Sequence, residues 1–233
     1  MNSHNTMVAL DNFTTKEDCL TFLKNLPEGL PIVKIGLEMF YRFGRDFVIE
    51  VNQDFGKKIF LDLKLHDIPN TAAKSMKALS DLPIDFLTVH LSGGEEMLKA
   101  CQQVRSDYMD SVSVLGVSYL TSLDHNDFKS LYGITSEHIP SYFTNLFQLA
   151  LKTKTQGVVC SAAELNLLKD YKQLIKVCPG IRFQDEIDSG KVGDQKRVLT
   201  PKQAFNNGAN YLVMGRSLTT SQSLQSRIRE LNS

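Results

Sequence analysis

The chain has 233 residues, 42% of them hydrophobic, so it can bury one substantial core, either as one α/β barrel or as two small domains. Its 26 basic and 26 acidic residues give a formal net charge of zero and are dispersed along the chain. This balance excludes a long-range field that would attract nucleic acid or an anionic membrane, so an anionic ligand must be held by a few local groups.

The spacing of cysteines and histidines indicates the cellular compartment of the protein and whether the protein has a metal site. The four cysteines form no CxxC pair, and the five histidines have no paired-ligand spacing. We therefore expect reduced, buried thiols in a cytoplasmic protein and no metal site. Residues 1–6 lack an apolar signal core, and no apolar stretch is long enough to span a bilayer, so we expect no membrane partner.

Short β-rich runs alternate with amphipathic, helix-like stretches along the chain. We predict strands at residues 7–11, 32–36, 58–64, 85–90, 111–117, 157–160, 174–178 and 210–215. We predict helices at residues 16–26, 71–82, 95–106 and 141–153, and an additional short helix within residues 123–141. Most of the strand-like runs are continuously apolar, which is typical of parallel strands covered on both faces.

The alternation of strands and helices predicts the fold class. Eight β-then-α units in this length indicate a (β/α)8 TIM barrel that comprises residues 1–233 as a single domain. A doubly wound open sheet is the alternative, because periodicity alone does not reveal whether a sheet closes. The sequence has no Pro- or Ser-rich linker and no repeat of 20–50 residues, so we place no internal domain boundary.

Polar residues follow or end several of the predicted strands. They lie at the ends of the first, second, third and last strands (Asp11, Lys34, Asp62, Lys64, Gly215 and Arg216). In (β/α)8 barrels the active site forms where the strands end and the following loops begin. Packing does not explain polar groups at one end of several apolar strands, so we expect these residues to converge on one pocket.

The most informative stretch is residues 60–71, Phe-Leu-Asp-Leu-Lys-Leu-His-Asp-Ile-Pro-Asn-Thr. Because an extended chain alternates its faces, Asp62 and Lys64 point to the same side, and Asp67 falls in the following turn. A buried lysine needs a charged partner, so we expect Lys34 to join them in an alternating array. Nearby carboxylates favour a charged lysine. Such an array suits a reaction that builds negative charge on carbon and then protonates it.

The C-terminal part of the chain contains a candidate phosphate site. Gly215 and Arg216 follow the last predicted strand, and phosphate often binds to the loops after strands seven and eight of such barrels. Glycine permits close approach of the backbone, and arginine supplies a forked donor for phosphate oxygens. The polar segment of residues 183–195 after strand seven is a candidate lid over this site.

Several segments resemble the orotidine 5'-phosphate decarboxylase family, in the same order and over nearly the whole chain. They are residues 8–11, 33–36, 62–71, 120–122, 179–182, 193–197 and 214–216, of which the Asp-x-Lys-x-x-Asp-Ile-Pro-x-Thr run is the most specific. The resemblance implies a (β/α)8 barrel that forms a homodimer with active sites at the interface. It also implies decarboxylation of orotidine 5'-phosphate to uridine 5'-phosphate in de novo pyrimidine synthesis, without a cofactor or a metal.

The resemblance also implies roles for the charged residues. Lys64 would protonate the pyrimidine carbon that loses carbon dioxide, and Asp62 would lie near the departing carboxylate. Lys34 would complete the catalytic array. Asp67 and Thr71 would reach into the site of the partner subunit.

Further positions would bind the substrate. Asp11 and Lys34 would hold the ribose hydroxyls, and either Thr121 or Ser122 would contact the pyrimidine. The residues implied to grip the phosphate, or to close over it, are Arg182, Gln195, Gly215 and Arg216.

Two alternatives remain compatible with the sequence. A sister decarboxylase or aldolase that acts on a sugar phosphate with bound magnesium would share the Asp-x-Lys-x-x-Asp run. It would be expected to carry an acidic metal ligand near strand two, where this chain has Lys34. The second alternative is a barrel that binds a nucleotide without catalysis, but binding alone does not require the costly cluster of Asp62, Lys64 and Asp67.

Overall fold

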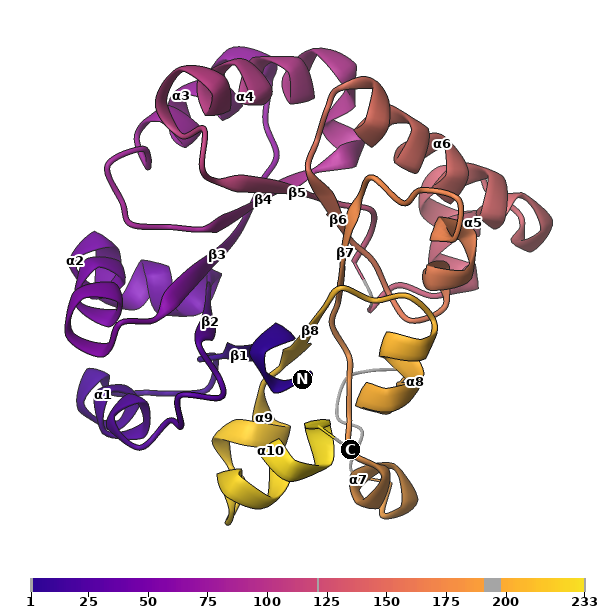
Figure 1. The fold of residues 1–233 in the computed structure, drawn as a ribbon. Helices are drawn as coiled ribbons and strands as arrows, with labels where there is room; N and C mark the ends of the chain where they lie inside the picture. Colours follow the sequence, from indigo (N-terminus) through magenta and orange to yellow (C-terminus); the bar gives the residue numbers. More distant parts are fainter. Residues whose placement is uncertain (1, 121, 191–197, 233) are drawn as a thin grey trace.

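The eight strands form a closed parallel barrel in the computed structural model, which describes residues 2–120, 122–190 and 198–232 (Figure 1). The strands are β1 (Thr6–Ala9), β2 (Ile32–Gly36), β3 (Lys58–Leu65), β4 (Phe86–His90), β5 (Ser113–Val117), β6 (Gly157–Val159), β7 (Ile175–Cys178) and β8 (Tyr211–Met214). Each pairs in parallel with the next, and β8 pairs with β1. The predicted (β/α)8 barrel is therefore confirmed, and the open-sheet alternative is wrong.

Helices surround the barrel on its outer side (Figure 1). They are α1 (Lys16–Lys24), α2 (Leu37–Phe55), α3 (Pro69–Lys77), α4 (Gly94–Tyr108), α5 (His125–Tyr132), α6 (Ile139–Lys152), α7 (Gln184–Asp188), α8 (Pro201–Asn206), α9 (Arg216–Thr219) and α10 (Leu224–Asn232). Short 3-10 turns lie at Ser3–Asn5, Leu91–Gly93, Ser136–His138 and Glu164–Leu168. The additional short helix predicted within residues 123–141 is α5.

The helix predicted at residues 71–82 is shifted toward the N-terminus in the structure. Pro69 occupies the first turn of α3, where the missing N–H of proline costs nothing and its fixed φ favours the helix. The helix ends at Lys77, although Leu79 and Leu82 beyond it are still buried. Apolar side chains in the turns after α3 therefore extend the hydrophobic pattern beyond the helix.

The strands are continuously apolar because helices cover one face and the barrel interior covers the other. Inward side chains form a separate layer inside the barrel, made by Met7, Ala9, Ile32, Phe60, Phe86, Leu115, Val177 and Val213. Side chains alternate along a strand, so the next inward positions on β2, β3 and β4 are Lys34, Asp62 and Thr88. The interior thus changes from apolar to polar toward the carboxyl ends of the strands.

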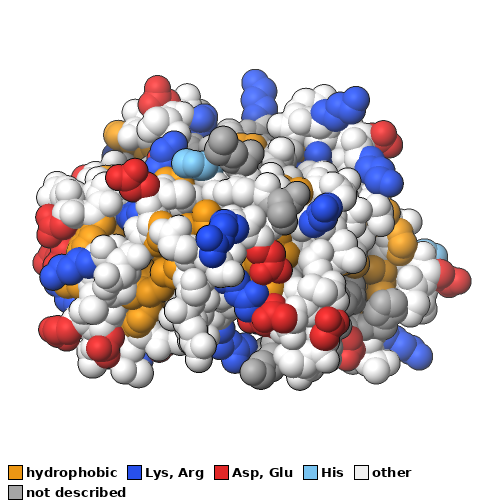
Figure 2. Space-filling view, turned by 60° about the horizontal axis from the view of Figure 1, so that its bottom comes forward, with side chains coloured by type: hydrophobic (Ala, Val, Ile, Leu, Met, Phe, Trp, Pro, Cys, Tyr) orange, Lys and Arg blue, Asp and Glu red, His pale blue; other side chains and the backbone are white. Residues whose placement is uncertain are grey.

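The surface and the thiols agree with the composition. In the view of Figure 2, basic and acidic side chains are interspersed and do not form a stripe of one sign. All four cysteines are unpaired and buried, as expected. Among the described residues, no helix has the length and hydrophobicity needed to cross a lipid bilayer.

Candidate active site

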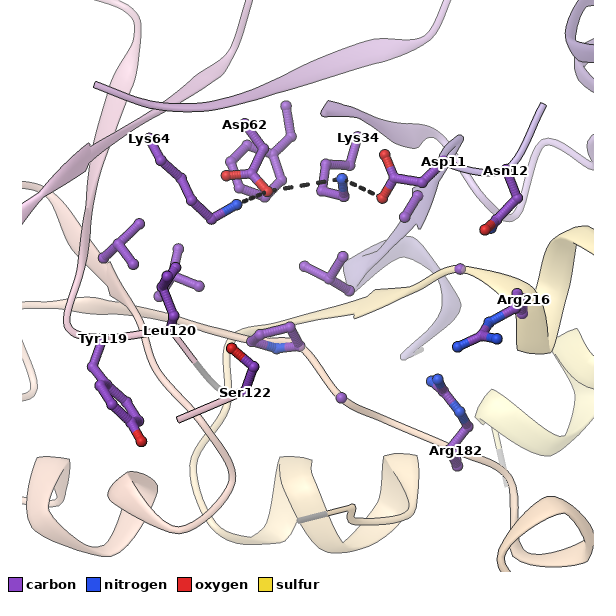
Figure 3. Close-up of a pocket in the computed structure, with 18 residues that line it drawn as sticks. Asp11, Asn12, Lys34, Asp62, Lys64, Tyr119, Leu120, Ser122, Arg182 and Arg216 are labelled. Carbon is purple, nitrogen blue, oxygen red and sulfur yellow. Dashed lines mark hydrogen bonds and ion pairs between the residues drawn. The ribbon is translucent and has the colours of Figure 1, made fainter. Parts of the chain in front are cut away.

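A pocket of about 380 Å³ opens at the carboxyl ends of the strands (Figure 3). Its lining comes from most of the strands and from the loops that follow them: Ala9, Asp11, Asn12, Lys34, Phe60, Asp62, Lys64, Val117, Tyr119, Leu120, Ser122, Val159, Pro179, Gly180, Arg182, Val213, Gly215 and Arg216. The apolar members include residues of the inner barrel layer. The pocket therefore sits directly on the apolar barrel core and is walled by charged groups.

Four charged side chains form a continuous row along one wall of the pocket, which we call the charged row: Asp11, Lys34, Asp62 and Lys64 (Figure 3). Lys34 Nζ lies 2.7 Å from Asp11 Oδ2 and 3.8 Å from Asp62 Oδ2. Lys64 Nζ lies 2.8 Å from the same Asp62 oxygen. The two signs alternate, so each inner member lies between two opposite charges.

Burial makes this alternation necessary. Lys34 and Asp62 are 6% and 8% exposed. Burial alone would raise the pKa of the Asp62 carboxyl, but the charges of Lys34 and Lys64 and the hydrogen bonds from Lys64 and Thr88 outweigh it, so the pKa lies below its ordinary value. A pair of opposite charges 4 Å apart gains about 4 kcal/mol at an effective dielectric constant of 20. Asp62 is therefore ionised at neutral pH.

Two arginines project into another part of the pocket. Arg182 follows β7 and is 8% exposed, while Arg216 begins α9 directly after Gly215. Figure 3 shows both guanidinium groups directed into the same region, away from Lys64. Guanidinium groups that converge in this way suit a phosphate, because each presents several fixed donors to anionic oxygens.

The pocket thus combines two convergent arginines with the charged row (Figure 3). A protein-family model described as the orotidine 5'-phosphate decarboxylase / HUMPS family matches residues 4–231. The chain belongs to this family. The family match spans all eight strands of the barrel and the whole lining of the pocket.

Individual relatives in this family agree over nearly the full length. An orotidine 5'-phosphate decarboxylase of Vibrio cholerae serotype O1 is 38% identical over 236 residues, covering 100% of this chain and 99% of the relative. One of Ligilactobacillus salivarius is 39% identical over 224 residues, covering 93% and 91%. The crystal structure of orotidine 5'-phosphate decarboxylase from Lactobacillus acidophilus has a TM-score of 0.80 at 30% identity, covering 97% and 96%.

Most residues assigned to the site by resemblance to the decarboxylase family come together in one pocket. The lining contains Asp11, Lys34, Asp62, Lys64, Ser122, Arg182, Gly215 and Arg216. Thr121 and Gln195 lie outside the described residues, as do residues 191–195 of the candidate lid. The described part of that segment contains α7, whose Asp185 pairs with Arg227 of α10.

Two other predicted residues lie apart from the pocket of their own chain. Asp67 is exposed, and its carboxylate accepts a hydrogen bond from the N–H of Ile68 at 2.7 Å. Thr71 is partly buried in the first turns of α3. Neither belongs to the described pocket lining, so the charged row within one chain contains Asp11 in place of Asp67.

Three residues of the site are not predicted by the sequence pattern. Asn12 lines the pocket with a left-handed backbone at φ 87°, which asparagine tolerates better than most residues. Tyr119 also lines it, packs on Phe128 with ring centroids 4.4 Å apart and donates from its hydroxyl to the carbonyl of Leu123. Thr88 lies below the charged row, and a lone threonine in an apolar strand is the one signal that indicates it.

The rim beside the charged row carries a histidine pair. The rings of His66 and His90 lie 4.9 Å apart, at the ends of β3 and β4. Burial, with the nearby His66 and Lys64, lowers the pKa of His90 to about 4, so its ring is neutral at physiological pH. Among the residues that the structure describes, no group of three or more His, Cys, Asp and Glu side chains is arranged to hold a metal ion.

Proposed function

We propose that this chain decarboxylates orotidine 5'-phosphate to uridine 5'-phosphate, the last step of de novo pyrimidine synthesis, without a metal or an organic cofactor. The observation that carries the proposal is the charged row facing two arginines across one pocket. The names of the relatives at 38% and 39% identity support it.

Lys64 is the proposed proton donor. The bond between the pyrimidine ring and the carboxylate breaks, carbon dioxide leaves, and the electron pair stays on the ring carbon. A proton from the Lys64 ammonium then forms the new C–H bond. The contact of Lys64 with ionised Asp62 supports this role, because the carboxylate holds the ammonium group in a fixed position inside the pocket.

Asp62 has the complementary role in the proposal. Its ionised carboxylate would lie beside the carboxylate of the substrate and favour its departure as neutral carbon dioxide. The positive charge of Lys34 and Lys64 would at the same time stabilise the carbanion that forms. The burial of Asp62 supports this assignment, since charges interact more strongly where water is excluded.

The remaining residues bind parts of the substrate far from the reacting bond. Asp11 and Lys34, joined at 2.7 Å, would hold the ribose hydroxyls, and either Thr121 or Ser122 would contact the pyrimidine. Arg182 and Arg216, with Gly215 and Gln195, would hold the phosphate. Binding energy from the phosphate would be used to order the charged row around the reacting carbon.

We further infer a cytoplasmic homodimer with shared active sites. Asp67 and Thr71 lie outside the pocket of their own chain, at the same rim of the barrel. Large apolar side chains that follow β2 and β3 are exposed, with Leu37 39% and Ile68 67% exposed. A second copy that covers this rim would bury these side chains and could bring Asp67 and Thr71 to the neighbouring pocket.

The first experiment is a turnover assay. Loss of ultraviolet absorbance from orotidine 5'-phosphate is followed with purified protein, in the presence and absence of a metal chelator. We expect chelator-independent turnover. If folded protein is inactive on the nucleotide but converts a sugar phosphate when magnesium is added, the sister activity within the family is correct instead.

Substitution of the proposed proton donor tests the mechanism separately. Lys64→Ala should abolish decarboxylation, because the variant lacks the proposed proton donor. Its affinity for uridine 5'-phosphate, measured by calorimetry, should change little, because the arginines still hold the phosphate. Near-normal turnover by this variant would show that Lys64 is not the donor.

A further inference from the structure

Thr88 connects two members of the charged row from the neighbouring strand. It lies in the middle of β4, is 0% exposed, and points into the barrel between Phe86 and His90. Its hydroxyl donates a hydrogen bond to Asp62 Oδ1 at 2.9 Å. The same hydroxyl accepts one from the backbone N–H of Lys64 at 2.8 Å. One buried group thus contacts the side chain of Asp62 and the backbone of Lys64.

These contacts occur where β3 departs from regular pairing. Leu61 pairs with Leu87 and Leu65 pairs with Val89, so the three β3 residues between them lie opposite Thr88 alone. Within this irregularity Lys64 has a left-handed backbone at φ 50°, which is uncommon for a residue with a side chain. The Thr88 hydroxyl supplies a partner for the Lys64 N–H where the regular ladder is interrupted.

The bond to Asp62 determines the orientation of its carboxylate. Oδ1 accepts from Thr88, while Oδ2 faces Lys64 Nζ at 2.8 Å and Lys34 Nζ at 3.8 Å. With one oxygen held by β4, the other remains directed at both lysines. Thr88 therefore constrains the direction of the carboxylate and the backbone from which the Lys64 side chain projects.

We infer that Thr88 is a positioning residue for the decarboxylation, holding Asp62 and Lys64 in their reactive arrangement through a single hydroxyl that both donates and accepts. The inference rests on the proposed function. The role requires a hydroxyl, because a methyl group in the same place can neither donate nor accept. Serine keeps both capacities, whereas valine keeps only the shape.

The test compares Thr88→Val with Thr88→Ser. We expect Thr88→Val to lower kcat about tenfold or more and to change KM less, because the phosphate and ribose contacts are untouched. We expect Thr88→Ser to retain most of the activity. Thr88→Ala, which introduces no bulk, replaces Thr88→Val in the comparison if the valine variant does not fold.

Thr6→Val is the matched control. Thr6 is also a fully buried barrel threonine, in β1, and its hydroxyl donates to the carbonyl of Asn2 at 3.1 Å. The Thr6→Val variant loses a buried hydroxyl in the same way as Thr88→Val, but residue 6 lies at the opposite end of its strand from the pocket. We expect kcat and KM of Thr6→Val to remain close to those of the wild type.

The pH profile of kcat distinguishes positioning from general loosening of the core. The titratable groups that face Asp62 are Lys34 on β2, Lys64 on β3 and His90 on β4, and they are present in every variant. Loss of the donated hydrogen bond destabilises the ionised form of Asp62. The acid limb of the profile should therefore move to higher pH in Thr88→Val and stay in place in Thr88→Ser and Thr6→Val.

Three outcomes would overturn the inference, two of them kinetic and one structural. Wild-type kcat and pH profile in Thr88→Val would show that the hydroxyl is dispensable. Equal loss in Thr88→Ser and Thr88→Val would mean that keeping the hydroxyl does not preserve activity, so that the effect comes from packing at this position. A crystal structure of Thr88→Val tests positioning even if the wild type proves inactive on the nucleotide. If Lys64 kept its left-handed backbone and its contact with Asp62 in that variant, the positioning role would be refuted and the proposed function would not.

Discussion

Lys34 and Lys64 illustrate how single residues in this pocket depend on one another. Each lies beside Asp62, and Lys34 also contacts Asp11. Removing one partner of a buried ion pair leaves an uncompensated charge, which is more costly than never having buried the pair. The charged row should therefore respond to substitution as a unit.

Asp62→Asn tests this dependence through stability. We expect the variant to lose on the order of 3 kcal/mol of unfolding free energy at pH 7 because both lysines lose a shared carboxylate. The pKa of Asp62 is lowered in the folded state, so its stabilising effect is present above its ordinary pKa and is lost as pH falls through the lowered value. The difference between wild type and variant should consequently shrink below about pH 4.

Guanidinium chloride unfolding at pH 7 and at low pH provides the measurement. The two proteins should converge in stability as Asp62 becomes protonated. A difference that stays constant across this range would mean that the effect comes from shape and not from charge.

Gly36 leaves the space that the Asp11–Lys34 pair occupies. A Cβ at this position would lie 2.6 Å from Asp11 Oδ1 and 2.7 Å from Lys34 Nζ. Its backbone, at φ −89° and ψ −177°, is one that alanine adopts freely. Only the ends of two flexible side chains would have to move, so the fold should tolerate a methyl group that the ion pair does not.

We therefore expect Gly36→Ala to fold and to lose about tenfold or more in kcat/KM, because both displaced groups are proposed ribose contacts. Gly29→Ala is the control, since its Cβ would have no neighbour closer than 3.6 Å. Thermal unfolding and steady-state kinetics of both variants are the measurements. Full activity in Gly36→Ala would show that the pair can shift without consequence.

Helix α7 is positioned by α10 through side chains next to the pocket. Arg227 of α10 binds both carboxylate oxygens of Asp185, at 2.9 and 2.8 Å. Its guanidinium also lies 4.2 Å from the ring centroid of Phe183, which is fully buried and directly follows the pocket residue Arg182. The C-terminal helix thus supports the wall that carries one of the two arginines.

Arg227→Ala should loosen this wall without affecting the charged row. We expect a loss of about 1 kcal/mol in stability and a several-fold rise in KM with little change in kcat. Arg229 lies on the exposed side of the same helix, so Arg229→Ala should leave KM and kcat unchanged. A fall in kcat at constant KM in the Arg227 variant would contradict the assignment of this wall to phosphate binding.

At the scale of the whole molecule, the barrel alone leaves Asp67 and Thr71 outside the pocket. In the proposed homodimer each site would combine Lys64 of one subunit with Asp67 of the other. Lys64→Ala and Asp67→Ala should then both be inactive as pure dimers, because each lacks one proposed catalytic group in both sites.

Mixing the two variants provides the decisive measurement. After subunit exchange, a mixed dimer has one site with both residues intact, so about a quarter of wild-type activity should return. Sedimentation of the mixture checks that dimers are present. Activity that stays absent in exchanged dimers would mean that Asp67 serves the site of its own chain.

The (β/α)8 architecture was largely predictable because it depends on local patterns. Each observed strand lies within two residues of its predicted bounds. The side-chain alternation that puts Asp62 and Lys64 on one face is also local, and the structure joins them at 2.8 Å. The end of α3 was less predictable, since Leu79 and Leu82 continue the apolar pattern in a turn.

The sequence by itself thus determined the number and order of the strands, the parallel sheet, and the ends of strands on which the charged groups lie. Only the tertiary structure decided that Asp11 completes the row with Lys34, that Thr88 bridges Asp62 and Lys64, and that Asp67 lies apart. The reason is physical: the direction of a side chain follows from its own strand, whereas a contact between strands depends on barrel closure and register. The irregular pairing of β3 with β4 is such a contact, and no local pattern in either strand encodes it.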